Sequence, residues 1–211
     1  MVSIEEKILY EINWRTEEIS IIKTVPFLFS VSKKQKEVLK KYVIPTFYSL
    51  WEGFFVECFS IYIREINKLK LSREQLNINM LVHSIDIKCD LRNGRVDFDK
   101  KIDFVKNILE HTDKEIELPV IVPTESNVNY KVTNAILRRF NLCQLPQVPF
   151  EKDLNKLLLL RNKIAHGENN IPVDQKMIDE ASLVVISSMH EVAEKVLSGY
   201  KSKSYLELIS S

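Results

Sequence analysis

Apolar residues recur at helical spacing along almost the whole chain, and this periodicity constrains the fold more than any other feature. Between residues 46 and 69 one face is apolar and the opposite face polar, as is typical of an amphipathic helix lying on a core. The apolar face is Phe47, Trp51, Phe54, Cys58, Tyr62, Ile66 and Leu69, and the polar face is Ser49, Glu52, Gly53, Glu57, Ser60, Arg64 and Lys68. We expect these aromatic side chains to pack in a core rather than to stack on bases.

The same spacing predicts helices in most of the remaining chain, and no convincing strand pair is present. Pro45 is expected to start or kink the helix that follows it, and Asn127 to cap a helix. The predicted helices cover residues 3–22, 73–88, 99–111, 128–141, 151–166 and 174–197, with a turn at Arg92-Asn93-Gly94, an extended connector at 116–125 and a loop at 144–149. The sequence therefore predicts an all-α bundle.

Size and charge narrow the class of protein. A chain of 211 residues is long enough to bury one core, so we expect a single domain over residues 1–211. Its 30 basic and 29 acidic residues give a net charge of +1, so contact with RNA would require a local basic patch. Such a patch is present at Lys33, Lys34, Lys36, Lys40 and Lys41, with Glu37 as the acidic residue among them. We expect a solvated face there, and tracking of an RNA backbone is the alternative.

The cysteines and the apolar runs favour a cytoplasmic protein. Cys58, Cys89 and Cys143 are odd in number, far apart and in apolar surroundings, which predicts buried thiols in a reducing compartment. The first residues show no signal-peptide pattern. No apolar run approaches the roughly 20 residues that a membrane span requires, so no membrane association is expected.

The few glycines and histidines exclude common nucleotide and metal sites. The four glycines lie far apart, so no glycine-rich loop can cradle a phosphate, and the histidines and cysteines have no metal-ligand spacing. We therefore expect neither a metal nor a cofactor. Gly167 and Gly199 are predicted to end helices. Gly53 lies in mid-helix, where it costs about 1 kcal/mol relative to Ala; we expect close helix packing there, with close approach of a second chain or of RNA as the alternative.

The most distinctive segment is an apolar helix that ends in Arg161-Asn162-Lys163-Ile164-Ala165-His166-Gly167. Gly167 is well placed to be the left-handed residue just beyond the helix. Asn162 and His166 are four residues apart and therefore lie on one helix face, one turn apart. The side chain of Arg161 is long enough to reach towards His166, so the three residues are expected to form one polar cluster.

This cluster suits metal-independent cleavage of RNA. An Arg guanidinium binds phosphate through a planar fork and stabilises the charge that develops on phosphoryl oxygens. A His titrates near neutral pH and can transfer protons. The alternative is structural, because Arg and His near the end of a helix often cap its carbonyls and complement its dipole.

These residues resemble the HEPN superfamily of all-α ribonucleases and nucleotide-associated proteins, and within it the RiboL-PSP-HEPN branch. Members pair a Trp-Glu-Gly-like triplet with a later Arg-Asn-x-x-Ala-His-Gly, and this chain carries Trp51-Glu52-Gly53 and residues 161–167. The resemblance covers roughly residues 35–70 and 125–200. The first helix and residues 72–125 fall outside it, and we interpret 72–125 as a family-variable insertion of extra helices.

The resemblance implies an endoribonuclease whose site forms between two chains of a homodimer, as in a bacterial toxin or an anti-phage defence component with a cognate antitoxin or partner protein. In that interpretation Arg161 binds phosphate, His166 transfers protons or positions the ribose 2′-hydroxyl, and Asn162 orients His166 or the phosphate. Glu52 would support them by hydrogen bonding to Arg161 or His166, or take a proton itself, and a solvated surface glutamate is the alternative. The competing hypothesis is a catalytically silent HEPN module that binds a partner protein or a nucleotide.

Overall fold

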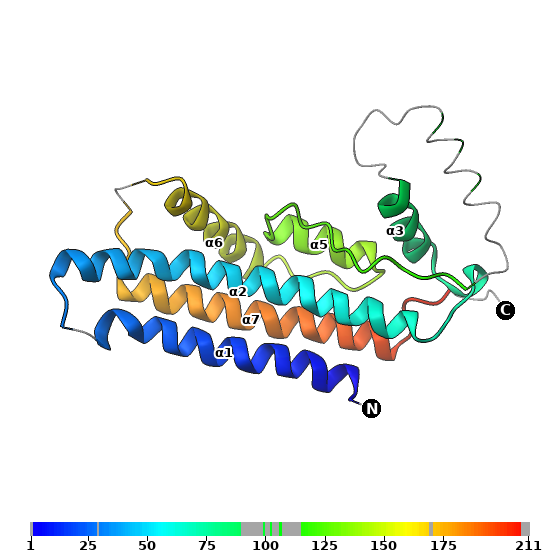
Figure 1. Ribbon diagram of the computed structural model, residues 1–211, viewed down its shortest axis with the longest axis horizontal. Helices are drawn as coiled ribbons and strands as arrows, with labels where there is room; N and C mark the ends of the chain where they lie inside the picture. The colour runs from blue at the N-terminus through cyan, green and yellow to red at the C-terminus, as the bar shows by residue number, and fades with distance from the viewer. Residues whose placement is uncertain are drawn as a thin grey trace.

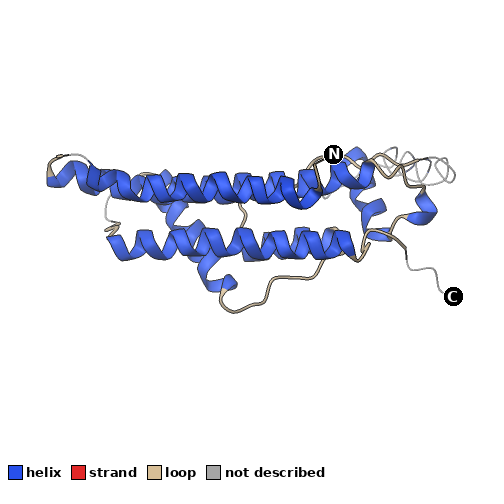
Figure 2. Cartoon of the chain, turned by 90° about the horizontal axis from the view of Figure 1, so that it is seen from below, coloured by secondary structure: helices blue, strands red, loops and turns tan. Residues whose placement is uncertain are grey.

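The computed structural model describes residues 2–28, 30–89, 99, 102, 106, 115–168 and 171–207, without the side chains of residues 88 and 89. Helices and loops make up these parts of the chain, and no strand occurs among them (Figure 2). The all-α prediction is confirmed. The helices are α1 (Ile4–Leu28), α2 (Lys33–Asn67), α3 (Ile78–Cys89), α5 (Tyr130–Arg139), α6 (Phe150–Ala165) and α7 (Gln175–Lys201), with a short 3-10 helix, η1 (Arg73–Gln75).

Three long helices, α1, α2 and α7, run side by side and form the body of the bundle (Figure 1). The shorter helices α6, α5 and α3 follow one another along one side of α2. Helix α6 packs on both α2 and α7, α5 packs on α6, and α3 packs on α5. This arrangement places α6, which carries the Arg-Asn-x-x-Ala-His segment, against the central helix α2.

Helix α2 is buried on more than one face because α1 and α7 cover it on one side and α6 on another. The predicted apolar stripe is buried except for Leu69, which is 42 % exposed beyond the end of the helix. Aromatic residues outside that stripe are buried as well, namely Tyr48, Phe55 and Phe59. The rings of Trp51, Phe55 and Phe59 follow one another at centroid distances of 5.5 and 4.9 Å. The aromatic side chains of residues 46–69 therefore pack in the core, as predicted.

Pro45 does not start a helix. Helix α2 begins twelve residues earlier at Lys33, behind a capping box in which Ser32 and Gln35 exchange side-chain and backbone hydrogen bonds, and it continues through Pro45. A proline inside a helix removes one backbone hydrogen bond and costs about 3 kcal/mol. Burial of Val43 and Ile44 before it and of Phe47 after it offsets that cost.

Other predicted boundaries shift by a few residues. Helix α1 continues to Leu28 rather than ending at residue 22, and α3 starts at Ile78 because residues 73–75 form η1. Helix α5 is capped by Asn129, whose side chain accepts from the Val132 amide, and not by Asn127. The connector 116–125 and the loop 144–149 contain neither helix nor strand. The Arg92-Asn93-Gly94 turn and most of the predicted helix over 99–111 lie outside the described residues.

Two further expectations are corrected by packing. Gly199 does not end a helix: it lies inside α7, where a Cβ would sit 2.0 Å from Leu142 Cδ2, so a larger residue would force the Leu142 side chain to shift. Cys58 is buried as expected, whereas Cys143 is exposed, and the Cys89 side chain lies outside the described part. Within that part, no helix has an apolar stretch long enough to cross a lipid bilayer.

Candidate functional site

The motif helix α6 ends in a Schellman motif, as the glycine predicted. Gly167 adopts the left-handed conformation with φ of 81°. The amide of Gly167 donates to the Ile164 carbonyl at 3.1 Å, and that of Glu168 to the Lys163 carbonyl at 3.0 Å, which is the pair of hydrogen bonds that defines this cap. His166 is the C-cap residue, so the Arg and the His of the motif occupy the last turns of one helix.

Arg161 points towards α2 rather than towards His166. Its guanidinium carbon lies over the ring of Tyr48, 4.9 Å from the centroid, a distance at which a cation is attracted to an aromatic face. Its Nη1 donates a hydrogen bond of 2.9 Å to Asn162 Oδ1. Arg161 forms no ion pair with any carboxylate of the described residues. The guanidinium is thus positioned without being neutralised.

Tyr48 is in turn fixed by the segment that precedes α5. The Val128 amide donates to the Tyr48 hydroxyl at 2.6 Å, and Trp51 Nε1 donates to the Val128 carbonyl at 2.9 Å. The side chains of Tyr48 and Trp51 therefore hydrogen-bond to both backbone polar groups of Val128. Burial, with the charge of Glu52 adding to it, raises the pKa of Tyr48 to about 12. The phenol stays neutral, so Tyr48 acts as a rigid aromatic platform for Arg161.

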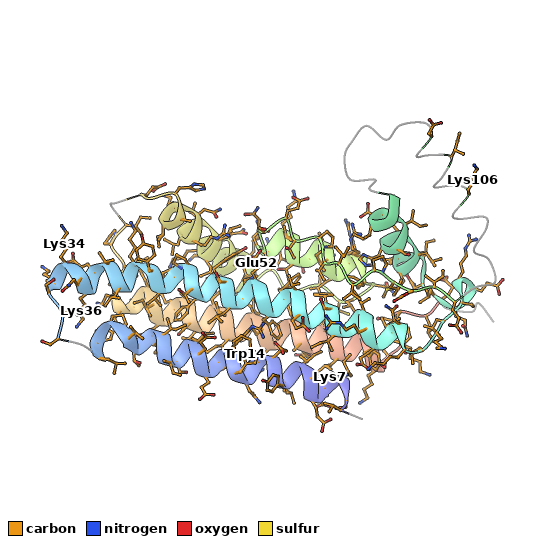
Figure 3. The ribbon with its side chains drawn as sticks, viewed as in Figure 1. Lys7, Trp14, Lys34, Lys36, Glu52 and Lys106 are labelled. Carbon is orange, nitrogen blue, oxygen red and sulfur yellow. The ribbon has the colours of Figure 1, made fainter. Side chains whose placement is uncertain are left out.

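Glu52 lies one turn after Tyr48 on the side of α2 nearest α6 (Figure 3). It is half-buried, and its Oε1 is buried without a hydrogen-bond partner. Burial raises the pKa of Glu52, and the positive charge of Arg161 opposes that rise. Glu52 therefore senses Arg161 electrostatically but donates or accepts no hydrogen bond with Arg161 or His166. A solvated surface glutamate does not describe it either, because one carboxylate oxygen is shielded from water.

The structure brings together Arg161, Asn162 and Glu52 but leaves the His166 side chain apart. That side chain is exposed and forms no hydrogen bond with the described residues, while its backbone amide donates to the Asn162 carbonyl at 2.9 Å. In this chain on its own no hydrogen bond joins the side chains of Asn162 and His166, and Asn162 Oδ1 accepts from Arg161 instead. The reason is geometric: Arg161 leaves the helix about 100° away from Asn162, towards α2.

Sequence reasoning missed Tyr48, the platform under Arg161. The available signal was its spacing, because Tyr48 and Glu52 are four residues apart and share one face of α2. Trp51, in contrast, has a structural role, since it is fully buried and anchors Val128.

The glycine of the Trp-Glu-Gly triplet is not required by packing against the described residues. Gly53 is exposed, and the nearest atom to an added Cβ would be Arg15 Nη2 at 3.6 Å, an ordinary contact. The expectation of close helix packing at Gly53 is therefore wrong. Close approach of a second chain or of RNA is the alternative that stays open.

Comparison with known families shows which family the chain belongs to. The model of a family described as MAE_28990-like HEPN matches residues 4–205, nearly the whole chain. The chain belongs to the HEPN superfamily. The search of curated proteins and the search of solved structures found no match. The matched family is named differently from the RiboL-PSP branch, so the branch stays a resemblance.

Membership in this superfamily indicates a role connected with RNA or with defence in general. The chemistry of this HEPN domain must be inferred from its own residues. In the part of the chain that the structure describes, no group of three or more His, Cys, Asp or Glu side chains is arranged to hold a metal ion.

Proposed function

We propose that this HEPN domain is a metal-independent endoribonuclease with a composite site at a homodimer interface. The observation that supports this most directly is the state of Arg161. It is held on Tyr48 and by Asn162, yet it has no carboxylate partner among the described residues. A guanidinium that serves only structure usually forms an ion pair when it is partly buried. One held ready for an anion keeps its fork free for a phosphate.

The proposed reaction is an internal transfer on the RNA chain. A base removes the proton of a ribose 2′-hydroxyl, and the 2′-oxygen attacks the adjacent phosphorus. The bond from phosphorus to the 5′-oxygen breaks, and that oxygen takes a proton from an acid. His166 supplies proton transfer, or positions the 2′-hydroxyl, and Arg161 stabilises the charge on the phosphoryl oxygens. Asn162 fixes Arg161, and Glu52 tunes the local charge.

A second copy of the chain would complete the site. One chain supplies a single His in the motif, whereas this reaction works best with two proton-transfer groups. A twofold axis beside the motif would bring the motif surface of one chain against the same surface of the second chain. Leu159 on α6 is 55 % exposed and Leu183 on α7 is 67 % exposed. A groove between these helices is lined by Leu160 and Leu183, among other residues, while Leu159 lies outside it. Covering this surface would bury apolar side chains within two residues of Arg161.

The products of cleavage test the chemistry. We expect cleavage that persists in EDTA, leaves a 2′,3′-cyclic phosphate and a 5′-hydroxyl, and fails on RNA with a 2′-O-methyl group at the cut site. Mass spectrometry of the fragments identifies the ends. Activity that EDTA abolishes and that added magnesium or zinc restores would refute the mechanism.

The oligomeric state tests the composite site. Sedimentation at micromolar concentration should show a dimer, and Leu159→Glu should produce an inactive monomer with an unchanged thermal midpoint. Leu69→Glu, at an apolar residue that is 42 % exposed and lies just beyond the far end of α2, is the control and should stay dimeric and active. A wild-type monomer that RNA does not change would contradict the dimer.

A growth assay tests the proposed role as a toxin or defence component. Expression of the wild-type chain should slow growth of the host, and His166→Ala should not. If both variants are harmless and neither cleaves RNA, the catalytically silent module that binds a partner protein or nucleotide becomes the better description.

A further inference from the structure

The start of α2 carries a concentration of positive charge that the fold leaves unneutralised. Lys33, Lys34, Lys36, Lys40 and Lys41, which we call the lysine ridge, lie within the first nine residues of the helix. None of the five forms an ion pair with a carboxylate of the described residues. Lys34 and Lys36 lie at the end of the bundle where α1 is connected to α2 (Figure 3).

This placement is unfavourable for the isolated chain. The N-terminus of a helix bears partial positive charge, so cations there are repelled and anions attracted. Lys36 and Lys40 are also one turn apart, a spacing at which like charges destabilise a helix. Glu37 is the acidic residue within the ridge. A bound polyanion would relieve both repulsions.

The ridge is continuous with the candidate site. Lys41 Nζ donates a hydrogen bond to the Glu168 carbonyl, just after the Schellman motif that ends α6. Seven residues further along α2, about 10 Å at the helical rise, lies Tyr48, on which Arg161 rests. A nucleic-acid strand that follows the ridge along α2 therefore arrives at Arg161 and the end of α6.

Exposed aromatic rings accompany the lysines. Tyr42 is 58 % exposed and directly follows Lys41, and Phe27 is 47 % exposed. The ring of Phe27 lies 4.3 Å from Lys36 Nζ and 5.3 Å from Lys40 Nζ, measured to its centroid. Proteins that bind single-stranded nucleic acids combine positive charge with exposed aromatic rings, because the charge attracts the phosphates and the rings stack on unpaired bases.

We propose that the lysine ridge and Tyr42 bind single-stranded RNA and guide it to Arg161. This inference rests on the proposed ribonuclease for its destination but not for its binding surface. RNA is favoured over an acidic protein because the exposed rings add stacking and because the ridge leads to the motif.

Binding and cleavage are measured separately to test it. A single-stranded RNA oligonucleotide is titrated against chains that carry His166→Ala, so that the RNA stays intact, over a range of salt concentrations. Replacing Lys33, Lys34 and Lys36 by Gln should weaken binding. It should also reduce the slope of log affinity against log salt by about 2, since each phosphate contact contributes about 0.7 for single strands. The thermal midpoint should not fall, because the lysines oppose the helix dipole.

Matched variants complete the test. Replacing Lys70, Lys201 and Lys203 by Gln removes the same charge from the other end of the bundle and should leave affinity and salt slope nearly unchanged (Figure 1). Tyr42→Ala should weaken binding by roughly tenfold, and Tyr42→Phe should retain it.

The outcomes separate this inference from the proposed function. If the wild-type chain cleaves RNA while the ridge variant and the control bind and cleave alike, the ridge inference is wrong. If no RNA is cleaved but the ridge variant alone loses RNA binding, the ridge stands and the ribonuclease fails. If the ridge variant keeps RNA binding and loses binding to poly-L-glutamate, the surface serves an acidic protein and the inference is overturned.

Discussion

Replacing His166 by Ala should separate catalysis from folding. The His166 side chain is exposed and forms no hydrogen bond with the described residues, and the cap it occupies is held by backbone groups and by Gly167. Such a surface change alters the free energy of unfolding by about 0.5 kcal/mol or less. For a chain of this size that shifts the thermal midpoint by about 1–2 °C. The cleavage rate should nonetheless fall by ~10²–10⁴ if His166 transfers protons.

Leu157→Ala is the matched control on the same helix. Leu157 is 3 % exposed, so its truncation should cost about 2–5 kcal/mol and lower the thermal midpoint by roughly 4–20 °C. Its effect on activity should follow only the loss of folded protein. Arg161→Ala lies between the two, because it removes a cation–π contact of about 0.5–1 kcal/mol and a hydrogen bond of about 1 kcal/mol.

The assay is thermal melting and single-turnover cleavage of RNA on the same preparations, with rates expressed per folded molecule. A His166→Ala chain that melts several degrees lower and cleaves at the wild-type rate would refute the reasoning. It would show that His166 only caps α6.

Two further predictions concern α2 and α7. Burial raises the pKa of Glu52, so the folded state favours the protonated carboxyl and loses stability as pH rises through that pKa. Glu52→Gln should therefore raise the thermal midpoint at neutral pH, and this gain should vanish below the ordinary pKa of about 4.3. An equal gain at pH 3 would contradict this. Gly53→Ala should stabilise the chain by about 0.5–1 kcal/mol. Gly199→Ala, whose Cβ meets Leu142, should instead destabilise it by about 1–3 kcal/mol. Denaturant unfolding measures both changes, and the same sign for the two would show that this packing argument is wrong.

Spacing along single helices was the part of the fold most accessible from the sequence. The apolar stripe of α2, the end of α6 at Gly167 and the start of α7 behind Asp174 follow from local rules on periodicity and capping. Several expectations failed where segments distant in the sequence pack together. Asn129 rather than Asn127 caps α5, and Val128, the residue before it, is held by Tyr48 and Trp51, some 80 residues earlier. Pro45 does not break α2 because α2 is packed on several sides.

The sequence by itself determined that the chain is helical, that Arg161, Asn162 and His166 share the end of one helix, and that the lysines cluster near residue 40. These properties depend on neighbours within about one or two turns, which the order of residues specifies directly. Only the tertiary structure decided which side chains meet. It turned Arg161 onto Tyr48 and away from His166, shielded one oxygen of Glu52, and joined Lys41 to the loop after the motif. Such contacts depend on how α2 and α6 pack, and packing between helices distant in sequence follows from the shape and burial of the whole core.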